Sequence, residues 1–218
     1  MPLHAYHHDN KSGDPGHPHH SSHSVPIDYL ASLGIPITSF EGPDFEGNAR
    51  KIAKEQGYPL TEKSTFIWDL HEPLSSSPMV KHHAHKIKEA SRNEIHFKKL
   101  IIIPDYLVAI IAGSVYLDVE DPLKQTWIRV ELPAGTLLHI PAGVSRRIAT
   151  ENVRALMFLK DESDIQVLWD KEAEAHPILN DPLALHILIV QNLNERNKIS
   201  RLRALEKTTS YRLFVVQT

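Results

Sequence analysis

The sequence predicts an all-β core, a barrel built from short strands, with short helices before it and a helical extension after it. From about residue 95 to residue 169, short apolar runs are interrupted by turn residues, a pattern typical of sandwiches and barrels. Strands do not alternate with long helical patterns, which argues against a parallel sheet. The 218 residues, 41% of them hydrophobic, suffice for one core and are few for two. We therefore expect one structural domain: residues 1–94 as an arm and helical or irregular segment packed on the barrel, 95–170 as the barrel core, and 171–218 as the extension.

The segment before the barrel is rich in histidine. Seven of the fifteen histidines lie in the first 25 residues, among Gly, Pro, Ser and Asp. This composition predicts an irregular polar arm on the surface, although histidines in such a tract can also bind transition metals. A short helix is expected around residues 48–59, because Asn48 can cap it, Gly57 can end it and Pro59 cannot continue it. A second helix is expected over residues 79–90.

The barrel strands follow from the apolar runs and the turns between them. The sequence Ala112-Gly113-Ser114 separates the first two runs, and Pro141-Ala142-Gly143 follows the fourth. The expected strands are residues 107–111, 115–119, 126–132, 136–140 and 154–159.

The segment after Pro182 is apolar on nearly all sides through Val190. Its length to about Leu205 favours a helix, and such a helix must be buried against another surface. We expect it to cover the outer face of the barrel or to form a homodimer interface. Residues 211–216 are expected as an edge strand.

Composition excludes several classes of partner. The formal net charge of −3 gives no basic field, so nucleic acid and anionic membranes are not expected as partners. No apolar stretch is long enough to span a membrane and the start does not resemble a signal peptide, so we expect a cytoplasmic protein. The absence of cysteine rules out disulfides and thiolate chemistry.

Two stretches have the spacing of the cupin motifs. The run Gly135-x5-Pro141-x-Gly143-x2-Arg146-x3-Thr150 matches the second motif at its two glycines and its proline, and differs at the metal-ligand and last positions. The first motif, His-x-His-x3-Glu-x6-Gly, can be aligned on Gly113. This alignment places its three ligand positions at Leu100, Ile102 and Tyr106.

Further residues make the chain resemble the acireductone dioxygenase family. The resemblance covers roughly residues 5–60 and 100–165. It is carried by Ala5-Tyr6, Ser12-Gly13-Asp14-Pro15, Tyr29-Leu30, Leu33-Gly34-Ile35, the helix expected at residues 48–59, the run 112–119, and Gln125-Thr126-Trp127-Ile128-Arg129.

The resemblance implies a cupin barrel and an Fe or Ni site formed by three His and one Glu, at which the family oxidises an enediol. Here the four ligand positions hold Leu100, Ile102, Tyr106 and Arg146, and we therefore expect no resident metal and no other cofactor. The arginine that binds substrate in the family is replaced by Val108. Rearranged ligands would have to come from other histidines, namely His85, His96 or His139.

The candidate site is an apolar pocket with two polar groups, Arg146 and Tyr106, as the candidate catalytic residues. Arg146 is a fixed cation that can stabilise an anionic oxygen, and Tyr106 can donate a hydrogen bond or a proton. Alternatively, Arg146 points outward or pairs with Asp105 or Asp118. The candidate substrate-binding residues are Leu100, Ile102, Val108, Ile110, Leu138, Trp127 and Trp169.

Three functional hypotheses follow. The first is a metal-independent enzyme that carries out a redox-neutral isomerisation, cyclisation or dehydration of a hydrophobic carbonyl or enol compound. The second is a non-catalytic relative that binds a small molecule or regulates a partner. The third is a metal-dependent dioxygenase with rearranged ligands. All three use a small molecule or a protein as partner, and a hydrophobic small molecule is expected.

Overall fold

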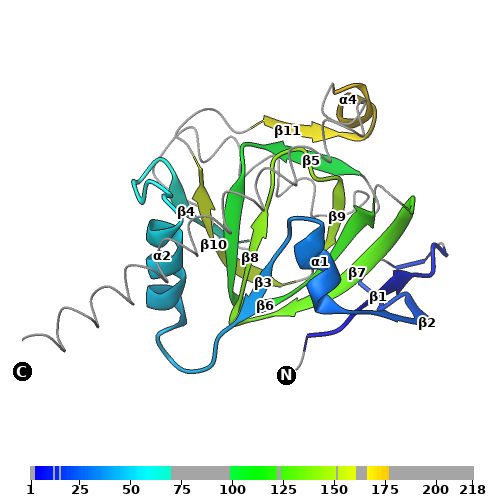
Figure 1. Cartoon of the computed structure of the whole chain (residues 1–218), viewed down its shortest axis with the longest axis horizontal. Helices are drawn as coiled ribbons and strands as arrows, with labels where there is room; N and C mark the ends of the chain where they lie inside the picture. Colours follow the sequence, from blue (N-terminus) through cyan, green and yellow to red (C-terminus); the bar gives the residue numbers. More distant parts are fainter. Residues whose placement is uncertain are drawn as a thin grey trace, which may run out of the picture.

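The structure, a computed structural model, describes residues 3–69 apart from 12 and 15, residues 99–160 apart from 122, 123 and 151, and residues 166–176. Within these ranges it contains eleven strands and three short helices (Figure 1). The strands are β1 (Ala5–His8), β2 (His20–Val25), β3 (Ile37–Ser39), β4 (Thr65–Asp69), β5 (Leu100–Ile103), β6 (Tyr106–Asp121), β7 (Thr126–Pro133), β8 (Thr136–Ile140), β9 (Arg146–Ala149), β10 (Val153–Leu159) and β11 (Gln166–Trp169). The helices are α1 (Ile27–Ser32), α2 (Phe45–Glu55) and α4 (Asp170–Ala175).

The strands form two antiparallel sheets that share β6. One sheet has the order β11-β5-β9-β6-β7-β1-β2. The other has the order β4-β10-β6-β8-β3. The main core cluster draws side chains from both sheets, for example Leu138 and Met157 from one and Leu117 and Leu132 from the other. The all-β barrel predicted from the sequence is therefore confirmed.

Strand β6 passes from one sheet to the other at Gly113. Residues 106–113 pair with β10, and residues 114–121 pair with β7. Gly113 has a φ of +75°, and an added Cβ would overlap the backbone oxygen of Asn152. A bulge next to it leaves Ile111 out of the pairing with β10, so that Ile110 before it and Val115 after it both face the interior.

Helix α2 covers the outside of the second sheet. Its buried residues, Ala49 and Ala53, belong to a smaller apolar cluster that includes Leu107 and Phe158. Because side chains alternate along a strand, Leu107 faces α2 while its neighbours Tyr106 and Val108 face the barrel interior. One face of this sheet therefore packs under a helix and the other lines the barrel.

The helix expected at residues 48–59 is confirmed, but its start was predicted three residues too late. The helix begins at Phe45 after Asp44, and Asn48 lies inside it. It ends before Gly57, whose φ of +74° is the left-handed conformation that commonly follows a helix.

The prediction of an irregular arm was wrong for residues 5–8 and 20–25, which form β1 and β2, and it holds for the described residues between them. Strands β1 and β2 form a hairpin, and β1 also pairs with β7, so the hairpin extends the first sheet. Ala5 and Tyr6 are buried against β7, and this contact stabilises β1. The polar composition of the segment gave no indication of it.

Strands β1 to β4 all precede residue 95, yet they are part of the two sheets: β1 and β2 belong to the first sheet, and β3 and β4 belong to the second. The helices expected over residues 79–90 and after Pro182, the possible dimer interface and the terminal strand lie outside the described residues. In the described part of the chain, no helix is long and apolar enough to cross a membrane.

Candidate functional site in the barrel interior

The structure brings the four cupin ligand positions together. Leu100 on β5 is the cross-strand partner of Arg146 on β9. The guanidinium carbon of Arg146 lies 5.1 Å from the ring centroid of Tyr106, the first residue of β6. Ile102 and Tyr106 line the same pocket. The alignment with the cupin motifs therefore identifies a real cluster of neighbouring side chains.

Arg146 lies inside the barrel. It is fully buried, and its cross-strand neighbours Leu100 and Val119 belong to the core cluster. Its Nη1 donates to the carbonyl oxygen of Val144 at 2.9 Å. Among the described residues, its Nε and Nη2 atoms are buried without a hydrogen-bond partner.

The carboxylates considered as partners of Arg146 bind other groups. Asp118 accepts two hydrogen bonds from Arg129, at 2.6 and 2.9 Å. Asp105 accepts the amide N–H of Ala142 at 2.7 Å. The structure thus shows neither the outward orientation of Arg146 nor its pairing with either of these two aspartates.

The two polar groups of the site influence each other. Burial raises the pKa of Tyr106 above its usual value, and the nearby Arg146 cation opposes this effect only in part. Tyr106 is therefore a neutral phenol at physiological pH and can donate a hydrogen bond. Burial lowers the pKa of Arg146, but a guanidinium starts so high that it stays protonated. The site therefore combines a cation with a hydroxyl donor.

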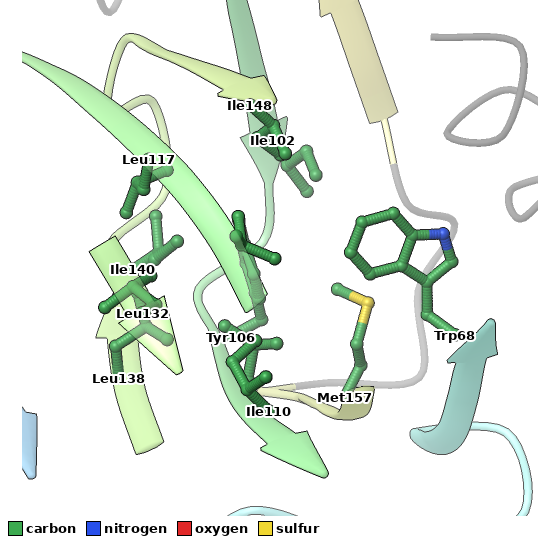
Figure 2. A pocket seen from close by; sticks show the side chains of 12 residues that line it. Trp68, Ile102, Tyr106, Ile110, Leu117, Leu132, Leu138, Ile140, Ile148 and Met157 are labelled. Carbon is green, nitrogen blue, oxygen red and sulfur yellow. The ribbon is translucent and has the colours of Figure 1, made fainter. Parts of the chain in front are cut away.

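An apolar pocket adjoins these groups, with a cavity volume of about 40 Å³ (Figure 2). Figure 2 shows Trp68 and Met157 on one side and Leu117, Leu132, Leu138 and Ile140 on the other. The lining comprises Trp68, Ile102, Tyr106, Val108, Ile110, Val115, Leu117, Leu132, Leu138, Ile140, Ile148 and Met157. Tyr106 belongs to both the pocket and the polar cluster, which places Arg146 next to the end of the pocket that Tyr106 forms.

Three candidate binding residues lie elsewhere. Leu100 is buried in the core and does not line the pocket. The ring of Trp127 lies 3.7 Å from the guanidinium carbon of Arg147, and Trp127 pairs with Glu120 across β6 and β7, on the outer face of the sheet. Trp169, at the end of β11, packs at the edge of the core. The prediction that these residues line the pocket is corrected accordingly.

The sequence analysis missed Trp68, which forms one side of the pocket. It lies on β4, where Phe66 and Trp68 are buried and Ile67 between them is partly exposed. The only signal in the sequence was the short apolar run Phe66-Ile67-Trp68. Within the described ranges, the Trp68 indole N–H is a buried donor without a hydrogen-bond partner. This N–H lies on the side of the ring that faces away from the other lining residues (Figure 2), so it adds no polar group to the pocket.

A comparison with curated proteins relates the chain to one family. It is 30% identical to the acireductone dioxygenase of Aspergillus fumigatus over 164 residues, covering 73% of this chain and 82% of that protein. It is 28% identical to acireductone dioxygenase 4 of Arabidopsis thaliana, covering 82% and 90% of the two chains. A solved structure, the acireductone dioxygenase from Bacillus anthracis with a cadmium ion in its active centre, aligns with a TM-score of 0.48 and 12% identity over 73% of this chain and 93% of that one. No family model matches the sequence.

The barrel and the position of its internal site define a protein of the cupin class. More narrowly, the identity to the Aspergillus fumigatus protein and the coverage of both chains show that this chain belongs to the acireductone dioxygenase family.

The residues at the family's metal positions do not fit a metal ion. Leu100 and Ile102 offer no donor atom, and Arg146 is a cation that repels another one. Tyr106 is the single oxygen donor of the four, and its raised pKa keeps it protonated. His139 is no substitute, because it lies on the opposite face of β8 from Leu138 and Ile140, and its Nδ1 donates to the Gly34 carbonyl at 3.2 Å. His85 and His96 lie outside the described residues.

The prediction of a metal-independent, redox-neutral enzyme was wrong. The curated relatives are named as dioxygenases, a class of oxidising enzymes, and nothing in the comparisons supports an isomerase, cyclase or lyase. What the comparisons support is the coarser statement that the relatives of this chain are enzymes.

Proposed function

We propose that the barrel interior binds a small molecule with an anionic oxygen at one end and a short apolar tail, the chemistry of an enediolate such as an acireductone. The observation that carries this proposal is the buried Arg146 guanidinium, which has no carboxylate partner among the described residues. The proposed role is to bind this ligand in a barrel of the family's type, in which other residues occupy the four positions of the family's metal ligands.

The cation accounts for the anionic end of the ligand. An unpaired charge in a protein interior costs several kcal/mol, so a site that buries one needs a group of opposite charge. A ligand oxyanion next to Arg146 supplies that charge and gives Nε and Nη2 an acceptor. The Tyr106 hydroxyl can donate to the same oxygen, because burial keeps it protonated.

The pocket accounts for the tail. Its lining is hydrocarbon apart from the polar end of Tyr106 and the sulfur of Met157. A cavity of about 40 Å³ has room for a few water molecules or a short aliphatic chain, and an apolar cavity favours the chain. The family relationship supports the choice of an enediolate, because the relatives' name refers to an acireductone.

The test compares two probes with the same tail. Hexanoate carries an anionic head and hexan-1-ol carries a neutral one. Calorimetric titration should show that hexanoate binds with one-to-one stoichiometry and about 10- to 100-fold more tightly than hexan-1-ol, the difference expected for a hydrogen bond to a charged group. The cyclic reductone 2,3-dihydroxycyclopent-2-enone should compete with hexanoate.

Two results would contradict the proposal. One is that hexanoate shows no saturable binding. The other is that hexan-1-ol binds as tightly as hexanoate, because the pocket would then recognise the tail alone. If hexanoate binds but the reductone does not displace it, the ligand class would be restricted to carboxylates.

A further inference from the structure

A second cluster of ligand-type side chains lies outside the barrel, on the β1–β2 hairpin. It consists of His8, at the end of β1, Asp9, which follows it, and His19, which precedes β2 (Figure 1). One donor atom from each residue lies within 4.8 Å of the other two. The cluster sits on the outer face of the first sheet, because His8 Nε2 is 3.8 Å from the carboxylate of Asp118, whose neighbours Leu117 and Val119 face the core.

The hydrogen bond to His8 shows which nitrogen of its ring carries a lone pair. The backbone N–H of Asn10 donates to His8 Nδ1 at 2.9 Å, so this nitrogen is unprotonated. The proton of the neutral ring is then on Nε2, which faces the Asp118 carboxylate. This arrangement, with a basic nitrogen on one side and a carboxylate behind the other, is the usual one for a histidine that binds a metal.

His19 has a similar arrangement, with a backbone carbonyl in place of the carboxylate. Its Nε2 lies 2.8 Å from the carbonyl oxygen of Asp14, and because a carbonyl only accepts, Nε2 must carry the proton. Its Nδ1 lies 3.1 Å from Asp9 Oδ1. A proton on this nitrogen makes the ring a cation that donates to Asp9, and a metal ion can take the place of that proton between the two atoms.

The spacing of the three donor atoms suits a small metal ion. In a tetrahedral site with bonds of about 2.0–2.2 Å, the donor atoms lie about 3.4 Å apart. The distance from Asp9 Oδ1 is 3.1 Å to His19 Nδ1 and 3.9 Å to His8 Nδ1, so the two observed distances bracket this value. The two rings are stacked with centroids 4.9 Å apart, and a small rotation brings both nitrogens toward one point.

We propose that His8, Asp9 and His19 bind one divalent transition-metal ion, for which Zn²⁺ is the best match. Two imidazoles and one carboxylate are ligands that zinc accepts, and zinc imposes little geometric preference of its own. Calcium and magnesium do not suit the site, since they prefer oxygen donors. The bound ion takes the place of the Asn10 N–H at His8 Nδ1, and water completes its coordination.

The bound ion would hold the loop between β1 and β2 in place above the buried ion pair of Arg129 and Asp118. The carbonyl oxygen of His17, in this loop, accepts a hydrogen bond of 2.6 Å from Arg129 Nη1, and Arg129 pairs with Asp118 beneath the loop. Metal binding joins both ends of the loop, at Asp9 and His19, and should therefore raise the melting temperature of the protein.

The test uses tag-free protein stripped with a chelator and titrated with ZnCl₂ by calorimetry. We expect one equivalent to bind in the micromolar range or tighter and the melting temperature to rise. Asp9→Asn and His19→Ala should each weaken binding at least tenfold. Asp9→Asn retains an oxygen for the Lys11 amide that Asp9 Oδ1 now accepts, so it serves if His19→Ala does not fold. Co²⁺ used in place of Zn²⁺ should give the visible absorption of a bound cobalt ion.

Histidines of the same segment provide the controls. His4 and His23 are exposed and lie outside the cluster, so His4→Ala and His23→Ala should leave zinc affinity unchanged. The proposal is overturned by the absence of saturable binding, by unchanged affinity in Asp9→Asn, or by equal losses in the two control variants, which would indicate adventitious binding to a histidine-rich tract. Hexanoate affinity should be the same in His19→Ala and the parent protein, which separates this site from the barrel pocket.

Discussion

Replacing Arg129 with methionine should lower the free energy of unfolding by about 3–5 kcal/mol, the cost of breaking a buried ion pair by removing one partner. Arg129 and Asp118 are both buried, and two hydrogen bonds of 2.6 and 2.9 Å join them. The variant leaves the Asp118 carboxylate without these bonds and removes the donor to the His17 carbonyl. Urea denaturation, with the midpoint and slope compared between the two proteins, measures the loss.

Arg146→Met is the matched control, because both arginines are fully buried. Removing the Arg146 side chain leaves no carboxylate without its partner among the described residues, and it deletes an unpaired buried cation. The free energy of unfolding should therefore stay unchanged or rise. A loss as large as that of Arg129→Met would mean that a carboxylate holds Arg146 in the folded protein. In that case Arg146 would be structural and the proposed ligand would have no cation to bind.

Gly113→Ala should cost more than about 3 kcal/mol of stability. A residue with a side chain is strained at the φ of +75° found here, and strain of this kind costs on the order of 1–3 kcal/mol. In addition, the new Cβ would overlap the backbone oxygen of Asn152, which accepts the N–H of Ser114. Relieving the overlap moves β6 where it passes between the two sheets. Thermal and chemical denaturation both report the effect.

Gly42→Ala separates the two causes of this loss. Gly42 also has a positive φ, +101°, but an added Cβ would have no atom within 4 Å. Only the backbone strain applies, and we expect a loss of about 1–2 kcal/mol. If both alanine variants lose the same free energy of unfolding relative to the parent protein, the close approach of Asn152 to β6 does not constrain the fold.

The parts of the fold that could be predicted are those with local signals. The predicted strands correspond to β6, β7, β8 and β10, because each is an apolar run with polar or turn residues at its ends. The prediction split β6 into two strands at Gly113, since a glycine inside an apolar run usually marks a turn. In the structure one strand continues through Gly113 and changes sheet there.

The strands that were missed depend on partners far away in the sequence. Strand β1 pairs with β7, and β4 pairs with β10, so each depends on a partner far away in the sequence. The hydrophilic sequence of β2, rich in histidine and serine, forms a strand because β1 lies beside it. Such pairings cannot be read from short windows of sequence.

The candidate site was predictable where it followed alternation along one strand. Val108 and Ile110 face the pocket with Tyr106 because they are two and four residues after it on β6. Trp127 was placed wrongly although alternation along β7 was available, because Ile128, Val130 and Leu132 form the core face of this strand and Trp127 lies on the other face. The cluster at His8, Asp9 and His19 was hidden for a different reason, since it requires the pairing of β1 with β2.

The central claim is that Arg146 binds an anionic ligand in the barrel, and the most direct measurement is the NMR signal of its side-chain Nε–H group. The signal can be assigned by its absence from the spectrum of Arg146→Met. During titration with hexanoate, it should shift with the same dissociation constant as calorimetry gives, while the corresponding signal of Arg129 stays in place and hexan-1-ol causes no such shift. An Arg146 signal that does not move while hexanoate binds would place the ligand elsewhere and contradict the account.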